Sequence, residues 1–293
     1  MAEAEIVAKG VRRVLAPNPS ALTYHGTNSY IVGTGRVAVI DPGPAMPEHL
    51  DALLAALRPG EAVGVILVTH AHLDHSGLAR PLAEATGAPV YAAGGAEEGR
   101  SASMQALAAS GFAEGGEGLD REFSPDRRLA DGAVLTGADW QLTALATPGH
   151  LGTHLAFALG EVLFTGDHVM AWSTTLVSPP DGDMGAYMAS LARLQKHPSR
   201  LFLPGHGPAV VDPARRVAEL IAHRKGREAA ILERLGPSGQ SARTLAQAIY
   251  SDIPSALLAA AERNVLAHLI DLSERGLVAR PSAPSVQARY RRL

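Results

Sequence analysis

The segment from Val68 to Gly77 constrains the fold of this chain most, because it places four potential metal ligands within six residues: His70, His72, Asp74 and His75. His70 and His72 are two residues apart, so in an extended segment both side chains point to the same face. The apolar run Val65–Val68 precedes the cluster, and a helix-like pattern begins at Ala79. The sequence therefore predicts a buried strand whose exit loop carries metal ligands.

Three later segments each combine a short apolar run, a turn that contains glycine, and then a ligand-type side chain. Those side chains are His150, Asp167 and His206. With the first cluster they give seven potential ligands on four loops, enough for two metals if one carboxylate bridges and each metal keeps a position open for water. The natural division is His70, His72 and His150 for one metal, Asp74, His75 and His206 for the other, and Asp167 for both.

The ordered set of these seven residues resembles the metallo-β-lactamase-fold hydrolase superfamily over roughly the first 210 residues. The resemblance implies an α+β fold, an αββα sandwich of two mixed sheets with helices outside and metals at one edge. It also implies hydrolysis at a dinuclear site by a metal-bound hydroxide, without a serine or cysteine nucleophile. Asp74 is then a candidate catalytic residue that accepts or relays a proton. Asp41 resembles the superfamily residue that orients a ligand near the metals.

The ligand types also bear on the metal. The chain has no cysteine, which excludes the true β-lactamase classes that use a cysteine ligand. Imidazole and carboxylate ligands suit zinc and also iron or manganese. Zinc is the first expectation for both divalent ions, because hydrolysis needs Lewis acidity without redox chemistry.

Residues 213–293 differ in character from residues 1–212, so we expect a catalytic domain followed by a second domain. The second segment carries 13 Lys and Arg against 7 Asp and Glu, a net charge of +6, whereas the first carries −9. Helical patterns over 213–234, 241–250 and 254–274 precede a strand-like Gly276–Arg280, which suggests a winged-helix-like domain. We expect its residues Arg224, Lys225 and Arg227 to face the entrance of the metal cleft.

Two substrate classes remain open. Several segments are similar to the β-lactamase-like protein 2 branch of the superfamily: Gly26–Gly33, Pro179–Gly182, Leu203–Pro208 and His223–Glu228. That branch includes endoribonucleases, so cleavage of single-stranded RNA is one expectation. The alternative is hydrolysis of a small molecule, namely a hydroxyacylglutathione-type thioester, a lactone or a β-lactam. A scaffold without activity would be expected to lose ligands, and all seven are present.

The remaining expectations concern single residues and location. His168 stands where the branch commonly has cysteine, and it either supports the metals or fills a polar loop. Thr174 and Arg224 are candidate substrate contacts. No apolar run reaches the length of a membrane span, and the N-terminus lacks the pattern of a signal peptide, so a cytoplasmic protein is expected. A homodimer is one possible assembly.

Overall fold

The first of two large sheets is built from residues 5–128. The computed structural model describes residues 4–112, 118–251, 254 and 257–293. Within them, the first sheet has seven strands in sequence order, antiparallel up to β4 and parallel from β4 to β7. The strands are β1 Glu5–Ala8, β2 Val11–Leu15, β3 Asn28–Val32, β4 Arg36–Ile40, β5 Ala62–Leu67, β6 Val90–Ala92 and β7 Arg127–Arg128.

The second sheet faces the first and has five strands in the order β12-β11-β10-β9-β8. Only β11 and β12 are parallel, because helix α5 (Met184–Leu194) carries the chain back between them. The other neighbours pair antiparallel. The strands are β8 Val134–Thr136, β9 Gln141–Ala146, β10 Leu155–Leu159, β11 Val162–Gly166 and β12 Leu201–Pro204.

Alternating apolar side chains bury both faces of the first sheet. In β4, Ala38 and Ile40 pack toward the second sheet, in one cluster with Phe157 and Phe164. Their neighbours Val37 and Val39 pack on the opposite face against helices α1 (Pro47–Ala55) and α3 (Ala79–Thr86). Period-two alternation with apolar residues on both faces is what a covered sheet requires.

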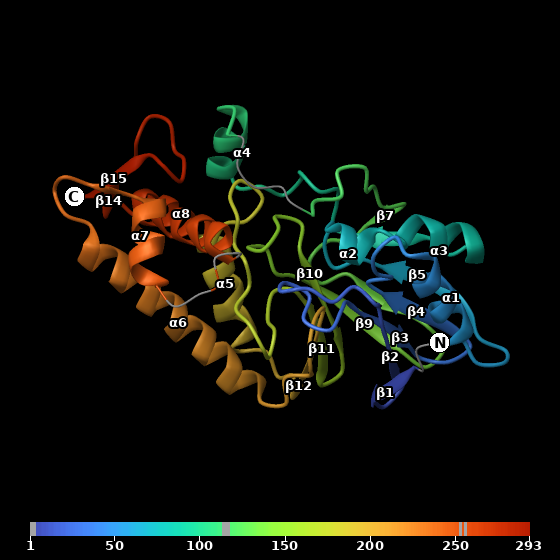
Figure 1. The fold of residues 1–293 in the computed structure, drawn as a ribbon. Coiled ribbons are helices and arrows are strands. Elements are labelled where there is room, and N and C mark those ends of the chain that lie inside the picture. The colour runs from blue at the N-terminus through green and yellow to red at the C-terminus, as the bar shows by residue number, and fades with distance from the viewer. Residues whose placement is uncertain (1–3, 113–117, 252–253, 255–256) are drawn as a thin grey trace.

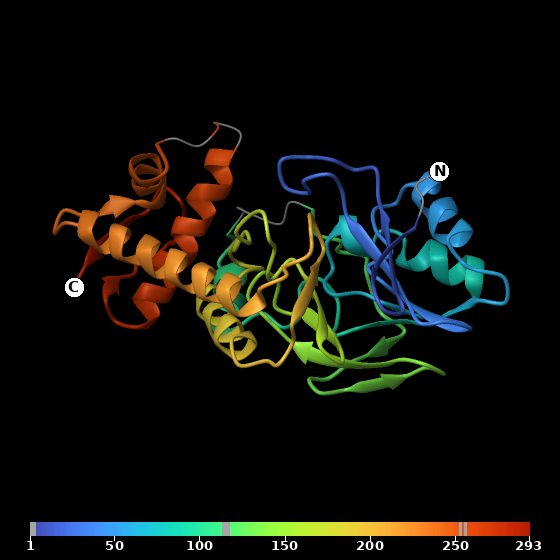
Figure 2. The ribbon, with the colours of Figure 1, turned by 90° about the horizontal axis from the view of Figure 1, so that it is seen from below.

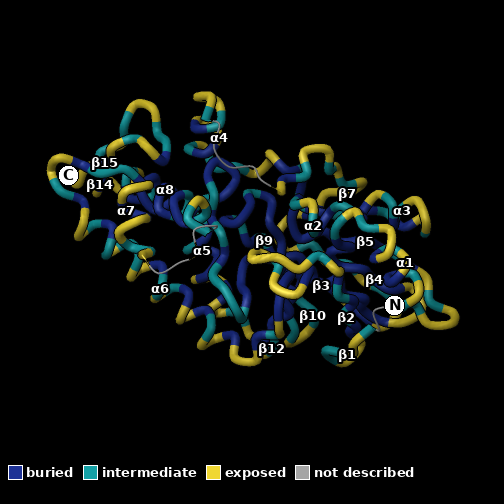
Figure 3. Tube along the Cα trace, in the orientation of Figure 1, coloured by how far each residue is buried: buried dark blue, intermediate teal, exposed yellow. Residues whose placement is uncertain are grey.

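Helix α5 and the first half of α6 (Pro213–Arg234) cover the outer face of the second sheet. The layers are therefore helix, sheet, sheet and helix, as Figures 1 and 2 show. In Figure 3 the strands in the middle of the sandwich are largely buried, whereas the connecting loops are exposed. The predicted αββα sandwich is confirmed.

The C-terminal unit has the strand order and helices of a winged helix. Its small sheet runs β13-β15-β14, with β13 Gln240–Ser241, β14 Val278–Ala279 and β15 Arg289–Arg292. Helices α7 (Ala242–Ile249) and α8 (Leu258–Glu274) pack beside it. The winged-helix prediction is confirmed.

Two helices join the C-terminal unit to the sandwich. Val217 and Leu220 of α6 belong to the core over the second sheet, while Ile231 belongs to the C-terminal core. Helix α4 (Ala102–Ala109) adds Met104 and Leu107 to that C-terminal core. Figure 2 shows α6 running from one unit into the other. Among the described helices, none has both the length and the apolar character needed to cross a bilayer.

Candidate metal centre

The loops that carry the predicted ligands meet at one edge of the sandwich. Strands β9 and β11 are both antiparallel to β10, and β12 is parallel to β11, so all three end on the same side. His150, Asp167 and His206 follow these three ends. His70 and His72 follow β5, and α2 (Leu73–Ser76) carries Asp74 and His75. The ligands that the sequence places on separate exit loops thus lie in one cluster in the folded chain.

Glycine is required where two of these loops pass through the cluster. A Cβ atom on Gly205 would lie 2.5 Å from Asp167 Oδ1 and 2.5 Å from His75 Cε1. Gly166 has a φ of +47°, and its Cβ would lie 2.7 Å from His154 Nε2. A larger residue at position 205 would displace two of the ligands, and one at position 166 would displace His154 and Thr69 beside them, so the glycine before Asp167 and the glycine before His206 are part of the site.

The ligand atoms form three overlapping groups, in each of which the atoms lie within 4.8 Å of one another. The first group is His70, His72 and His150, and another is Asp74, His75 and His206. The remaining group, His70, His75 and Asp167, connects those two. The structure therefore brings all seven predicted ligands together, and their buried clusters are consistent with a dinuclear metal site.

The chemistry of the cluster fits divalent cations. His150 Nε2 lies 3.0 Å from His72 Nδ1, and His75 Nε2 lies 3.3 Å from His206 Nε2. Two imidazole nitrogens that face each other can share only one proton, whereas a cation between them satisfies both lone pairs. His70 Nε2 and Asp167 Oδ1 are buried without a hydrogen-bond partner among the described residues. These atoms are unsatisfied in the way that metal ligands are before the metal binds.

The pKa values divide the histidines into two sets. Burial lowers the pKa of His70 and His150, and it lowers the pKa of His72 to about 3. Those imidazoles are neutral at pH 7, the form that binds a metal. Burial acts the same way on His75 and His206. For these two histidines, the attraction of the Asp74 and Asp167 carboxylates outweighs the effect of burial. The pKa of His75 therefore lies well above its usual range, and that of His206 rises to about 9.

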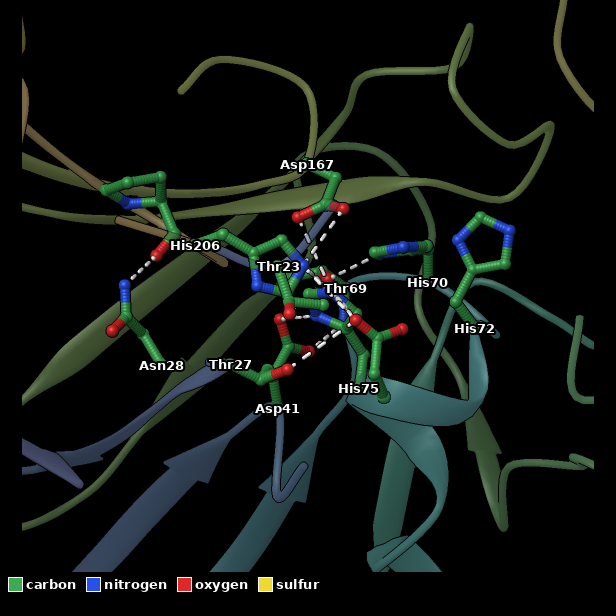
Figure 4. Close-up of polar contacts among 12 residues, drawn as sticks. Thr23, Thr27, Asn28, Asp41, Thr69, His70, His72, His75, Asp167 and His206 are labelled. Carbon is green, nitrogen blue, oxygen red and sulfur yellow. Dashed lines mark hydrogen bonds and ion pairs between the residues drawn. The ribbon is translucent and has the colours of Figure 1, made fainter. Parts of the chain in front are cut away.

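Hydrogen bonds behind the ligands fix their orientation (Figure 4). Asp41 Oδ2 lies 2.9 Å from His75 Nδ1, and its Oδ1 accepts from the main-chain nitrogen of Thr69 at 2.7 Å. Asn28 holds the other side of the centre, because its amide donates to the carbonyl oxygens of Pro204 and Gly207 on either side of His206. The sequence motif around Asn28 thus positions the last ligand.

A pocket of about 300 Å³ opens onto the cluster. Its floor contains His72, Asp74, His150, Asp167 and His206. The rest of its lining comes from the loop Ser20–Thr23, from Leu73 and Gly118, and from the segment after Asp167, which contributes Met170, Trp172, Ser173, Thr174 and Leu176. Thr174, a predicted substrate contact, therefore lines the pocket.

Arg224 corrects an expectation from the sequence, because it does not face the entrance. Its side chain is 1% exposed, and its guanidinium lies 5.3 Å from the centre of the Tyr187 ring. Arg227 makes a cation–π contact within the chain, since its guanidinium lies 4.3 Å from the centre of the Tyr250 ring. Of the predicted cationic group, Lys225 is the exposed member. The entrance is formed by other residues.

His168 is fully buried next to Asp167. Its ring packs against Tyr187 with ring centres 4.6 Å apart, and neither ring nitrogen has a hydrogen-bond partner among the described residues. It packs behind the site and bonds to none of the described ligand side chains. His154 is also buried, and its Nδ1 lies 2.8 Å from Thr147 Oγ1.

Sequence reasoning missed the pocket wall formed by Ser20–Thr23 and by Trp172. Trp172 lies against Tyr24, with ring centres 5.1 Å apart, and a Cβ on Gly207 would touch its ring. These loops have no periodic pattern and meet only in the folded chain. The aromatic residues in two separate loops were the only local signal.

The fold and the site together define a metallo-hydrolase. The sequence profile of the Metallo-beta-lactamase superfamily matches residues 22–206, and the chain belongs to that superfamily. The profile of the Beta-lactamase associated winged helix domain matches residues 241–285, in the C-terminal unit.

Individual relatives extend the similarity over nearly the whole chain. A Beta-lactamase-like protein 2 homolog of Caenorhabditis elegans is 29% identical over 287 residues, which cover 94% of this chain and 88% of the relative. An Atrochrysone carboxyl ACP thioesterase of Aspergillus fumigatus is 30% identical over 259 residues, 84% of this chain and 71% of the relative. The crystal structure of a metallo-beta-lactamase family protein from Thermus thermophilus superposes with a TM-score of 0.79 at 28% identity, over 98% of this chain and 100% of that one.

Proposed function

We propose that this chain hydrolyses thioesters of apolar acyl groups at a dinuclear zinc centre. The observation that carries the proposal is the composition of the pocket above the ligand cluster. Leu22, Leu73, Met170, Trp172 and Leu176 supply its walls, and no Lys or Arg occurs among the described lining residues. Leu22 is 56% exposed and Leu73 is 50% exposed. Such a surface favours an apolar chain over a polyanion.

The titratable side chains that line the pocket favour a thiol as the leaving group. In the described lining they are His72, Asp74, His150, Asp167 and His206, all of them candidate ligands. The pocket therefore offers no free general acid among the described residues. A thiol has a pKa of about 8.5 and leaves as an anion without prior protonation. The alkoxide that leaves from a phosphodiester or a lactone is a stronger base, so its departure depends more on protonation by a general acid.

Bound cations would lower the pKa of a water molecule and polarise the scissile carbonyl. The chain's own part is to place these groups. Asp74 faces the pocket, and its Oδ2 lies 3.2 Å from His206 Nε2 and 3.6 Å from His75 Nε2. Burial raises its pKa, but the neighbouring histidines outweigh burial and hold the pKa low, so the carboxylate is ionised and accepts a hydrogen bond from water. In the reaction, the water oxygen bonds to the carbonyl carbon, the carbon–sulfur bond breaks with its electron pair remaining on sulfur as the thiolate, and the proton that the water loses passes to solvent.

Single-stranded RNA, the other expected substrate, would need cations along its backbone. Arg224 is buried, Arg227 stacks on Tyr250, and Arg275 pairs with Glu228 and Asp271. The exposed arginines of β15 lie at the end of the molecule away from the sandwich (Figure 1). These placements favour a small substrate, and RNA cleavage is the competing outcome of the test.

The position of α8 also favours the small substrate. In a helix-turn-helix, the second helix enters the groove of the nucleic acid. Helix α8 occupies that position after α7, yet it is buried at nine positions from Ala261 to Leu272. One of them, Ala267, belongs to the core over the second sheet. The helix is thus used for packing inside this chain.

The comparison with known proteins supports the same choice. The Aspergillus relative named as an ACP thioesterase is similar across 84% of this chain. Zinc is proposed because nitrogen and oxygen ligands suit it and hydrolysis needs no redox change. Metal analysis of the active protein that found iron or manganese instead would overturn the zinc assignment and leave the thioester proposal to its own test.

The decisive experiment compares both substrate classes with one preparation. Zinc-loaded protein is given acetyl, octanoyl and palmitoyl thioesters of N-acetylcysteamine and, separately, an end-labelled single-stranded RNA. Because the chain has no cysteine, released thiol is measured without background from the enzyme. We expect thioester hydrolysis that is faster for octanoyl than for acetyl and is absent in Asp167→Ala. RNA cleavage that Asp167→Ala abolishes, without thioester hydrolysis by the wild type, would refute the proposal.

A further inference from the structure

The residues Thr175, Leu176 and Val177, here called the tether, touch two of the candidate ligands. Thr175 Oγ1 donates to the main-chain oxygen of Asp167 at 2.7 Å. The main-chain oxygen of Leu176 lies 2.7 Å from His150 Nδ1. A carbonyl that accepts the Nδ1 proton leaves His150 Nε2 as the nitrogen free for a metal. The tether therefore sets the orientation of His150 and holds the backbone at Asp167.

The other side of the tether is held by the connecting helix α6 and by α8 of the C-terminal unit. Arg224 of α6 donates to the main-chain oxygen of Thr175. Asn264 of α8 accepts, through Oδ1, from the main-chain nitrogen of Val177 at 3.1 Å and from Arg224 Nη1 at 3.1 Å. Each of the three tether residues thus bonds either to a candidate ligand or to this Arg–Asn pair, and Thr175 bonds to both.

In the part of the chain that the structure describes, Arg224 is a buried cation that is held by hydrogen bonds and not by a carboxylate. The guanidinium is buried, and it forms no ion pair with a carboxylate among the described residues. A buried charge without a counter-ion is costly and persists where hydrogen bonds hold it. The guanidinium contacts the carbonyl of the tether, the amide oxygen of Asn264 and the ring of Tyr187.

We propose that Arg224 and Asn264 are positioning residues of the metal centre, and that they act through the tether on His150 and Asp167. The winged-helix unit then has a defined part in the hydrolase: its α8 and the adjoining α6 hold the loop that orients metal ligands. The inference rests on the proposed metal centre but not on the thioester, so a failed thioester assay leaves it standing. It predicts a loss of metal affinity that is largest at the site containing His150.

The test measures zinc binding by competition with a chelator, because metal affinity can be read without substrate. His150→Ala first identifies the binding step that belongs to His70, His72 and His150. Asn264→Leu and Arg224→Met should then weaken that step about tenfold or more, as the loss of a group behind a ligand does. The step that belongs to Asp74, His75 and His206 should weaken less. Asn264→Asp, which keeps an acceptor at the same place, should restore most of the affinity.

A matched control separates positioning from general damage. Arg243→Met also removes an arginine from the C-terminal unit, where Arg243 Nε lies 3.2 Å from Glu262 Oε1, but Arg243 does not contact the tether. It should lower the unfolding temperature and leave both zinc-binding steps unchanged.

Thr175→Val provides a second route, since it deletes the hydroxyl donor to Asp167 while keeping the size of the side chain. If Arg224→Met does not fold, Asn264→Leu and Thr175→Val decide the question. The proposal is overturned if the folded variants bind zinc at the His150 step as tightly as the wild type. It is also overturned if Arg243→Met loses zinc affinity to the same degree.

Discussion

His75 Nδ1 lies 2.9 Å from Asp41 Oδ2, and this contact determines which nitrogen of His75 faces the other ligands. With its Nδ1 proton donated to Asp41, the ring presents Nε2 toward Asp74, Asp167 and His206. Asp41 itself has a φ of +49°, a conformation that Asp and Asn adopt more readily than other residues with a Cβ. The geometry of the backbone and the tautomer of the ligand are therefore linked.

The first prediction follows from that tautomer. In Asp41→Asn, the amide can place an N–H where the carboxylate accepted, so that His75 Nδ1 must accept and Nε2 carries the proton. We expect zinc to bind the Asp74, His75 and His206 site about 10 to 100 times more weakly, with the fold retained. Chelator competition measures the change, and circular dichroism serves as the control for folding. An unchanged affinity would mean that Asp41 does not govern His75.

The second prediction concerns Asp167, which lies in the group that connects the other two. Its Oδ1 is 3.4 Å from His75 Nε2, and its Oδ2 is 3.3 Å from His206 Nε2 and 3.9 Å from His150 Nε2. Asp167→Ala should abolish hydrolysis and lower the metal content at both sites. Elemental analysis after gel filtration checks the stoichiometry. Near-normal turnover in this variant would show that Asp167 is not the bridge.

The seven ligands could be predicted from the sequence because each follows a local pattern. An apolar strand is followed closely by a His or Asp, with a glycine turn between them before His150, Asp167 and His206, and parallel strands bring such exits to one edge. The αββα layers were expected from the resemblance of the ligand set to the superfamily, and not from periodicity. The structure supplies the physical reason, since β4 and β5 are apolar on both faces.

Arg224 was placed wrongly because a charged residue was assigned to the surface by default. The spacing in α6 contained the opposite signal. Beyond Pro213 at its start, the buried apolar residues of this helix are Val217, Leu220 and Ile231, and Arg224 stands four residues after Leu220 and seven before Ile231. Residues at these intervals share a helix face. The helical spacing of α6 therefore indicates an interior position for Arg224 in spite of its charge.

The pocket wall could not be predicted, since it depends on contacts between segments without local pattern. Leu22 and Trp172 are 150 positions apart in the sequence and line the same pocket. The same holds for Asn264, whose bond to Val177 spans 87 residues. Only the tertiary topology brings such pairs together.

The third prediction concerns pH and separates the two metal sites. His206 has a pKa raised to about 9 and that of His75 is raised as well, so at pH 7 both carry protons that a metal must displace. Zinc affinity at their site should therefore rise with pH up to about 9, with proton release on binding. The lowered pKa values of His70, His72 and His150 predict little proton release at the other site near pH 7.

Calorimetry in two buffers with different ionisation enthalpies measures the released protons. The same raised pKa values have a consequence for the metal-free protein, with a definite sign. Protonated His75 and His206 stabilise the fold fully below the unfolded value of 6.5, and that stabilisation is lost as the pH rises through the folded value. The melting temperature in the presence of a chelator should fall between pH 6.5 and 9. A rise over this interval would contradict the pKa assignment.

The fourth prediction tests the apolar wall directly. Leu22 and Leu73 line the pocket and are half exposed, so each is free to cover an acyl chain. Burying one such side chain is worth about 1.5 kcal/mol or more, so Leu22→Ser and Leu73→Ser should each raise KM for an octanoyl thioester about tenfold. KM for the acetyl thioester should change little, because its single methyl group has little apolar surface to bury.

Val211→Ser is the matched control, since Val211 is 81% exposed and is not among the residues that line the pocket. It should leave KM for both thioesters unchanged. The ratio of the two KM values in each variant is the quantity to compare, because a general loss of fold or metal would affect both substrates alike. Equal changes for octanoyl and acetyl thioesters in Leu22→Ser and Leu73→Ser would show that the wall does not bind the acyl chain, and the basis for choosing an apolar thioester would be lost.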